Sequence, residues 1–366
     1  MLQNITNWRK DMYKNYQKLN DEIKEYFKIL CSDFPEWLND YINTPEMQRT
    51  EGISNTCGTE YSKLIGAEYW YSNLSHSIGV ALIIWNFTHS KEQTLAGLFH
   101  DIATPVFKHC IDFMNGDAKK QESIEEKTES IILSSEEIMY LLERDNIDYK
   151  KVIDYKIYSI ADNDMPKLSA DRLEYTFSSG LACKRVWNLD NVKKCYENIT
   201  ILKNEDGIEE LGFKDKEIAE SFIHTLPNLW NKWISDKDRI AMQFIADITK
   251  SMIIEEYITV DDLYNLSDKE VIEKINTCPD KNISSCFKKF QNTTEICTSD
   301  EKVEDKYCTS ILGKIRYVNP LVEVNNGCDR IDAVSDVARN DINNFLNKEH
   351  SKYIYFNFDF KPYGKE

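Results

Sequence analysis

The sequence contains no long hydrophobic run and no paired-cysteine motif. The longest apolar run near the middle of the chain, residues 78–85, is far shorter than the roughly 20 residues that a membrane-spanning helix needs. The first residues lead directly to Lys10 and Asp11 without an apolar core segment, so we predict no signal peptide. The 10 cysteines include no Cys-x-x-Cys pair, which argues against a zinc ribbon or a thioredoxin-type motif. We therefore expect a soluble cytoplasmic protein with no membrane partner and with reduced, mostly buried thiols.

Glycine and proline are scarce, with 12 and 8 residues among 366, and positive charge is in deficit. With 42% hydrophobic residues the chain can bury a sizeable core, which excludes a collagen-like, low-complexity or wholly disordered protein. The 45 Lys and Arg residues against 62 Asp and Glu residues give a net charge of −17. Such a surface repels nucleic-acid phosphates, so we expect no nucleic-acid partner. An anionic substrate would need positive charge inside its own site, which a metal ion would supply.

Apolar residues recur mostly at helical spacing, which predicts a mainly α protein. The segments expected to be helical are residues 8–30, 75–87, 92–100, 134–142, 169–179 (ended by Gly180), 218–257 and a helix opened by the capping box at 267–270. Residues 281–305 are expected to form a loose connection, and residues 313–324 and 353–360 show strand signals. We predict a helical body over residues 1–275 and a small mixed α/β appendage over residues 276–366.

Histidine is also rare, and four of the 6 histidines lie between positions 76 and 109. His100 and Asp101 follow an apolar run at residues 95–99, where an unpaired charge would be costly. Neighbouring residues on a helix point about 100° apart, so this pair could offer a nitrogen and an oxygen to adjacent corners of a metal octahedron. From these residues alone, a metal site and a structural ion pair both remain open. We expect His89 and His350 to be solvated and His224 to be a core or interface side chain.

Four short motifs follow one another over about residues 41–180. They are Thr44–Arg49 (TPEMQR), His76–Ala81 (HSIGVA), the pair His100-Asp101 followed by His109, and Ser169–Tyr175 (SADRLEY). This ordered series resembles the HD-domain metal-dependent phosphohydrolases, and within them the deoxynucleoside triphosphate triphosphohydrolase-like branch. Residues 314–320 (KIRYVNP) also resemble members of that family. The resemblance implies an HD-domain helical bundle core that carries a metal-dependent hydrolytic site.

The resemblance also assigns expected roles to individual residues. One divalent metal ion (Mn, Fe, Ni or Mg) would be bound by His76, His100, Asp101 and Asp171. His109 would contact the phosphate or the leaving group, and Asp112, three residues later on the same helix face, would orient its imidazole. The substrate-binding residues would be Gln48, Arg49, Arg172 and Tyr175. Lys108 is a possible phosphate neighbour, but we expect it to be an ordinary solvated cation.

Four positions depart from the family pattern. Asn73 stands in place of an arginine, Ser75 of a glutamate, Thr104 of a histidine and Ser179 of an aspartate. These positions concern recognition of polyphosphate and deoxyribose rather than metal binding. We therefore predict a phosphohydrolase acting on a nucleotide or small phosphate ester, with weakened discrimination for deoxynucleoside triphosphates. A phosphomonoesterase with a non-nucleotide substrate and a non-catalytic regulatory or scaffold protein are the alternatives, and a homo-oligomer is open.

Overall fold

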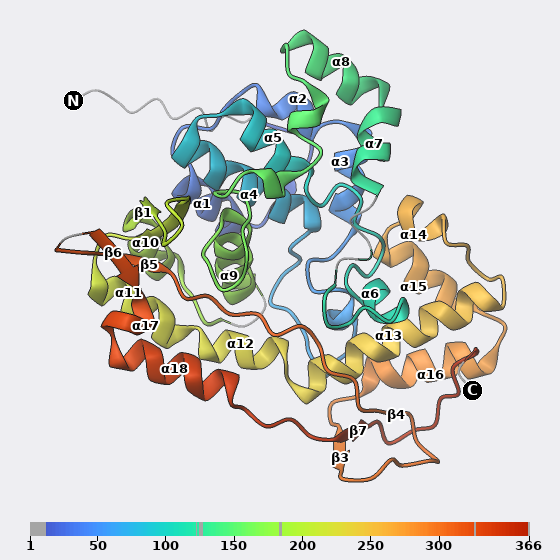
Figure 1. The fold of residues 1–366 in the computed structure, drawn as a ribbon. Helices are drawn as coiled ribbons and strands as arrows, with labels where there is room; N and C mark the ends of the chain where they lie inside the picture. The colour runs from blue at the N-terminus through green and yellow to red at the C-terminus, as the bar shows by residue number, and fades with distance from the viewer. Residues whose placement is uncertain (1–11, 122, 124–126, 183–184, 326, 365–366) are drawn as a thin grey trace.

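The computed structural model describes residues 12–364, except residues 122, 124–126, 183–184 and 326. The fold is mainly α with small sheets, as the sequence predicts; helices make up most of the molecule in Figure 1, and one small sheet lies at its lower edge. Within the described residues, every helix is too short or too polar to cross a bilayer. The predicted helix at residues 8–30 begins outside the described part; within it, a 3₁₀ turn over Tyr16–Lys18 precedes α1 (Asp21–Leu30).

The centre of the fold is a pair of buried helices, α4 (Asn73–Thr88) and α5 (Lys91–Phe99), with α9 (Ala170–Ala182) packed against α4. Ser72 begins α4 by accepting the backbone N–H of Ser75. Residues 73–84 of α4 are all buried: residues 78–84 are apolar on every face, whereas the start of the helix buries polar side chains, among them His76. His89, with a φ of 52°, ends α4 and turns the chain toward α5, where Ser90 caps the first turn.

The other helices form two groups around two hydrophobic cores. They are α2 (Leu38–Ile42), α3 (Pro45–Arg49), α6 (Cys110–Met114), α7 (Thr128–Ser134), α8 (Glu136–Arg144), α10 (Leu189–Glu197), α11 (Lys216–Thr225), α12 (Pro227–Trp233), α13 (Asp236–Ile254), α14 (Asp262–Asn265), α15 (Asp268–Thr277), α16 (Lys281–Asn292), α17 (Ile331–Val334) and α18 (Asp336–Leu346). The larger core lies around α1, α4, α5 and α9, and the smaller one around α13, α15 and α16. A cavity is lined from both sides, by His76 of α4 and by Met242 of α13 among others.

Two small sheets complete the fold. The first has the order β1-β2-β5-β6 and consists of β1 (Ile199–Lys203), β2 (Glu209–Phe213), β5 (Leu321–Val324) and β6 (Gly327–Arg330). Its β2 and β5 are parallel and the other pairs antiparallel, so this sheet joins strands from both sides of residue 275. The second sheet is antiparallel, with β7 (Tyr353–Tyr355) between β3 (Cys297–Ser299) and β4 (Cys308–Thr309). The division into two parts at residue 275 stays a prediction.

Several sequence expectations about single elements are wrong. The β1–β2 hairpin lies in a region expected to be overwhelmingly helical. Residues 281–292 form α16 rather than a loose connection, because Asp280 caps the helix and Ile283, Phe287 and Phe290 repeat on one buried face. Gly180 does not end α9 but lies inside it, where an added Cβ would be 2.0 Å from the Trp187 ring. The two tail segments with strand signals contain only the short strands β5 and β7.

Candidate metal centre

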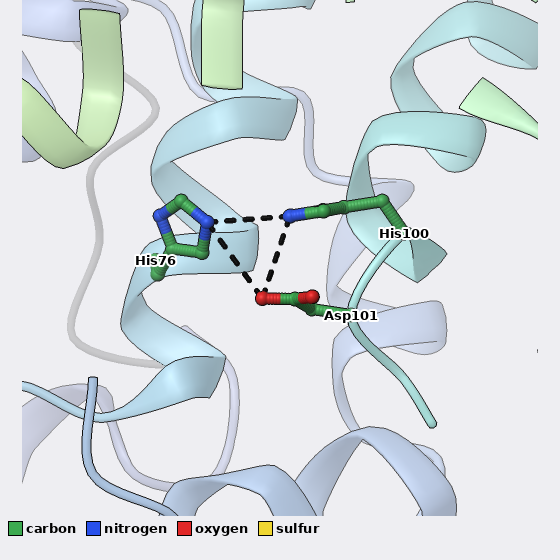
Figure 2. Close-up of side chains that lie close together, drawn as sticks. All are labelled: His76, His100 and Asp101. Carbon is green, nitrogen blue, oxygen red and sulfur yellow. Dashed lines mark hydrogen bonds and ion pairs between the residues drawn. The ribbon is translucent and has the colours of Figure 1, made fainter. Parts of the chain in front are cut away.

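Two histidines from different helices meet at the wall of the cavity. His76 lies in the first turn of α4 and is 2% exposed, and His100 directly follows α5. Their Nε2 atoms are 3.2 Å apart, and the Oδ2 atom of Asp101 lies 3.8 Å from the first and 3.5 Å from the second. Figure 2 shows these three side chains pointing at one another. Their nearest donor atoms all fall within 4.8 Å of one another, as ligands of a single ion would.

Asp171 brings a second carboxylate to the same place. It lies in the first turn of α9, and its Oδ1 atom is 3.1 Å from Nε2 of His76 and 3.7 Å from Nε2 of His100. The structure therefore brings together the four side chains that the sequence resemblance implies as ligands. Their role as ligands stays a prediction.

The Nδ1 atoms of His76 and His100 both have hydrogen-bond partners in the protein, so only their Nε2 atoms are available to a metal ion. Nδ1 of His100 donates to the carbonyl of Gly97 at 2.7 Å, and Nδ1 of His76 faces a carboxylate oxygen of Glu174. The two Nε2 atoms therefore face each other and the carboxylates of Asp101 and Asp171. Either a proton on His76 or a metal ion that displaces it satisfies this arrangement, and two imidazoles with two carboxylates suit a divalent transition metal or Mg²⁺. The side chains at this site therefore fit a divalent metal ion.

Glu174 is a functional candidate that the sequence reasoning missed. It is fully buried and accepts hydrogen bonds from Tyr71 at 2.5 Å and from Ser178 at 3.2 Å, besides its contact with His76. Burial by itself would lower the pKa of His76, but the carboxylates of Glu174 and Asp171 together outweigh it and raise that pKa to about 9. The sequence did contain one indication of this role: Glu174 follows Asp171 by three residues, which places both on the same side of α9.

Lys108 is not a solvated cation, and this corrects the sequence expectation. Its side chain is buried, and its Nζ atom lies 2.8 Å from Oδ2 of Asp101 and from the side-chain oxygens of Asn55 and Asn73. Although burial opposes ionisation, Lys108 and the two histidines hold the pKa of Asp101 well below its usual range. The structure thus has a cation beside Asn73, the position where the family pattern has an arginine.

Lys108 reaches this place because the backbone turns sharply before it. Phe107 and Lys108 both have positive φ values, 62° and 44°, which is uncommon for residues other than glycine. The buried carboxyl group of Asp268 accepts the N–H of Phe107 at 3.0 Å and holds this turn. The left-handed turn is a consequence of tertiary contacts that no local sequence pattern indicates.

His109 and Asp112 form the pair that the sequence suggested. Nδ1 of His109 is 3.0 Å from Oδ2 of Asp112, a fully buried residue whose other oxygen accepts two hydrogen bonds from Ser123. Burial lowers the pKa of His109 to about 4, although Asp112 opposes this shift, and nearby Arg316 and Lys108 add to it. The imidazole is therefore neutral near pH 7, with its proton on Nδ1. Its Nε2 atom accepts from Arg316 at 3.3 Å.

The cavity beside these groups has a volume of about 750 Å³. All four candidate ligands line this cavity, together with His109, Tyr155, Tyr175 and Trp233. Its walls carry charges of both signs. The cations are Lys108, Lys156, Lys167, Arg172, Arg239, Lys314 and Arg316, and the acids are Asp101, Asp162, Asp164, Asp171, Glu209 and Asp238. A cavity with this lining can take an anion that has an aromatic or apolar part.

The predicted substrate-binding residues divide into two pairs. Arg172 and Tyr175 line the cavity, with Arg172 held by Asp162 at 2.8 Å. Gln48 and Arg49 are not among the lining residues. Gln48 donates to the carbonyl of Ile42, and Arg49 donates to that of Thr104, so both stabilise the surrounding backbone.

The other histidines and the cysteines can also be compared with the expectations from the sequence. His224 is not a core side chain: its side chain is 70% exposed and pairs with Asp341 on α18, and its expected role at an interface stays a prediction. His89 is exposed, as expected, and His350 is half-buried. The nine cysteines in the described ranges are all unpaired, and six of them are buried, while Cys183 lies outside the described residues.

Comparisons with known proteins bear on this site. No family model matches the chain. Among curated relatives, an uncharacterized protein of Mycoplasma genitalium is 22% identical over 351 residues (83% of this chain, 79% of that protein), and the uncharacterized protein YdhJ of Bacillus subtilis is 21% identical over 312 residues (82% and 89%). The metal-dependent phosphohydrolase cns2 of Cordyceps militaris is 21% identical over 311 residues (83% and 84%).

Two solved structures share the architecture. A hypothetical protein from Aquifex aeolicus has a TM-score of 0.58 at 15% identity, covering 88% of this chain and 92% of its own. A phosphohydrolase from Bacteroides thetaiotaomicron has a TM-score of 0.56 at 13% identity, covering 87% and 94%. The chain shares its fold with a phosphohydrolase. The names of these five proteins do not identify the triphosphohydrolase-like branch, which stays a hypothesis.

Proposed function

We propose that this chain is an HD-type metal-dependent phosphohydrolase that cleaves a phosphate ester or anhydride of a nucleotide or another small phosphate. The observation that supports it most is the convergence of two imidazole nitrogens and two carboxylates at one point of a cation-lined cavity. The similarity to a relative named as a metal-dependent phosphohydrolase and to a solved phosphohydrolase structure adds support.

The candidate ligands would hold the ion, and the protein fixes their orientation in advance. Mn, Fe, Ni or Mg bound there would polarise a phosphoryl oxygen and lower the pKa of a bound water. Glu174 and the carbonyl of Gly97 hold the rings of His76 and His100 through their Nδ1 atoms, so that both Nε2 atoms face the ion. Lys108 and Arg316 place positive charge near the reacting phosphate, which balances the negative charge that develops there.

His109 is the candidate proton carrier. Asp112 fixes its tautomer, so that Nε2 faces the cavity and is unprotonated in the free protein near pH 7. An anion that enters the cavity favours the charged imidazolium and raises the pKa of His109. In this scheme His109 gains a proton as the phosphate binds and donates it from Nε2 to the leaving oxygen.

The substrate is proposed to be a small molecule with weak selection for deoxyribose triphosphates. Ser179 lines the cavity with a neutral hydroxyl where the family pattern has a carboxylate. A carboxylate would form a charge-assisted hydrogen bond to a sugar hydroxyl, which is about twice as strong. A phosphomonoesterase with a non-nucleotide substrate fits the same cavity, because the site selects phosphate more clearly than it selects a base.

Metal analysis and a substrate panel test this proposal together. We expect about one divalent ion per chain after metal soaking, and phosphate release from at least one of dGTP, GTP, dGMP and a generic phosphomonoester. A preference for dGTP over GTP above roughly 1,000-fold would contradict the weakened sugar selection. A chain that binds no ion, or that binds one and hydrolyses nothing on a wider phosphate panel, would favour the non-catalytic alternative.

A further inference from the structure

An extended segment of the C-terminal part, residues 311–319, crosses the cavity between β4 and β5 (Figure 1, orange). We call this segment the strap. It is fixed at both ends: Arg239 donates to the carbonyl of Ile311 at 2.7 Å, and the N–H of Asn319 donates to the carbonyl of Pro166 at 2.7 Å. The strap is therefore a fixed wall of the cavity rather than a loose connection over it.

The side chains of the strap divide between the cavity and the solvent. Leu312 and Ile315 are exposed, whereas Lys314 and Arg316 line the cavity. Nη2 of Arg316 contacts Nε2 of His109 and the side-chain oxygen of Gln121, and its guanidinium carbon lies 5.9 Å from the centre of the Tyr175 ring. The strap thus delivers a guanidinium group to the residue that is the candidate proton carrier.

The hydrogen-bond partners of Arg316 distinguish it from other arginines of the cavity. Arg172 is paired with the carboxylate of Asp162, and Arg239 with that of Asp236. Among the residues that the structure describes, the side chains that Arg316 contacts by hydrogen bonding are a neutral imidazole and an amide. An anion can replace such partners without leaving a carboxylate unpaired, so the charge of Arg316 is available to a ligand in a protein of net charge −17.

We propose that Arg316 binds an oxygen of the substrate phosphate, and that the strap is part of the active site; this rests on the proposed phosphohydrolase function. The ligand chemistry is that of a tetrahedral phosphate, because a guanidinium offers a planar fork of donors that matches two of its oxygens. Arg316 would supply the bidentate arginine contact that Asn73 cannot make. It would also hold the phosphate beside Nε2 of His109, where the leaving oxygen needs a proton.

Calorimetric titration with inorganic phosphate tests this role directly. We would compare the metal-soaked wild-type protein with Arg316→Ala, Arg316→Lys and, as a matched control, Arg185→Ala, whose guanidinium pairs with Glu22 at the surface. Loss of a charge-assisted contact should weaken phosphate binding about 10- to 100-fold in Arg316→Ala. Arg316→Lys should lie between Arg316→Ala and the wild type, Arg185→Ala should match the wild type, and metal content should be the same in all four.

The outcomes separate this inference from the proposed function. Wild-type protein that binds no phosphate, or Arg316→Ala with an affinity within about twofold of the wild type, overturns the role of Arg316. If Arg316→Ala does not fold, Arg316→Lys is measured in its place. A phosphate affinity of Arg316→Lys equal to that of the wild type would then overturn the proposed role of Arg316. Failure of metal binding or of hydrolysis would contradict the proposed function, whereas phosphate affinity reports on Arg316 in either case.

Discussion

Asp101 makes the closest charged contact between the candidate metal site and the cations of the cavity. Its Oδ2 atom faces both histidines and also accepts from Lys108 at 2.8 Å. We expect Asp101→Ala to lose most of the bound metal and to lower hydrolysis by several orders of magnitude, because water activation and charge compensation depend on the ion. Metal analysis and phosphate release measure both effects. His89→Ala should stay near wild type, and equal losses in the two variants would mean that the site is misplaced.

Glu174 would act on a bound metal ion through its contact with His76. Glu174→Gln keeps an acceptor for Nδ1 of His76 but removes the charge behind the ring. We expect metal affinity to fall about 10- to 100-fold while the protein remains folded. Competition with a chelator measures this, and exposed Glu143→Gln on α8 is the matched control. Unchanged affinity in Glu174→Gln would show that the contact with His76 is only structural.

Some residues of the candidate site could be predicted from the sequence, and others are evident only from the structure. The four implied ligands and the His109–Asp112 pair belong to short motifs, so they could be found without coordinates. Glu174 was missed although its place three residues after Asp171 was a local signal. The contacts of Lys108 and Arg316 could not be found, because they arise between residues far apart in the chain. Arg316, for example, meets His109 across 207 positions. The burial of Lys108 was not expected, because lysine side chains in proteins are ordinarily exposed to solvent.

At the scale of single elements, α9 shows why its glycine matters. It carries both Asp171 and Glu174, and Gly180 lets Trp187 pack directly on its backbone. Gly180→Ala should destabilise the protein by about 1–3 kcal/mol, since an added Cβ would overlap the Trp187 ring and outweigh the gain in helix propensity. Urea unfolding measures this. Gly313→Ala, whose Cβ would be at an ordinary 3.6 Å from Phe113, is the control and should cost less.

Helix ends were predictable where the capping chemistry is local. The capping box of Ser267 and Glu270 forms as expected, and Ser135 rather than Ser134 caps α8. The β1–β2 hairpin was missed because β2 is stabilised by parallel pairing with β5, a partner more than 100 residues later. Strand pairing of this kind depends on the tertiary fold more than on the local pattern.

At the scale of the whole molecule, charge is distributed unevenly. The net charge is −17, yet Lys108, Arg172 and Arg316 are gathered at one cavity beside the candidate ligands. The cavity lining nevertheless also contains six acidic residues, so its positive charge nearly balances its negative charge while the whole chain is strongly acidic. A small anionic substrate therefore stays a proposal, and it would meet less repulsion here than over most of the protein.

Asp268 links three distant parts of the chain, and its effect belongs to the stability of the whole molecule. It is the first residue of α15, and its two oxygens accept the N–H groups of Ser54 at 2.8 Å and Phe107 at 3.0 Å. Burial raises the pKa of Asp268 to about 8, since the two backbone hydrogen bonds offset only part of this cost. Glu60 raises the pKa further, and Arg49 opposes it.

This raised pKa makes the stability depend on pH. An unfolded chain releases the Asp268 proton near pH 3.9, whereas the folded protein keeps it up to about pH 8. Folding therefore takes up a proton between these values, so this group's contribution to the free energy of unfolding falls as pH rises through the window and is constant outside it. Urea unfolding between about pH 5 and 7.5 should show a slope of up to about 1.4 kcal/mol per pH unit from this group. Asp268→Asn should remove that slope, while exposed Asp300→Asn should keep it; a wild-type slope in Asp268→Asn would show that Asp268 is ionised throughout.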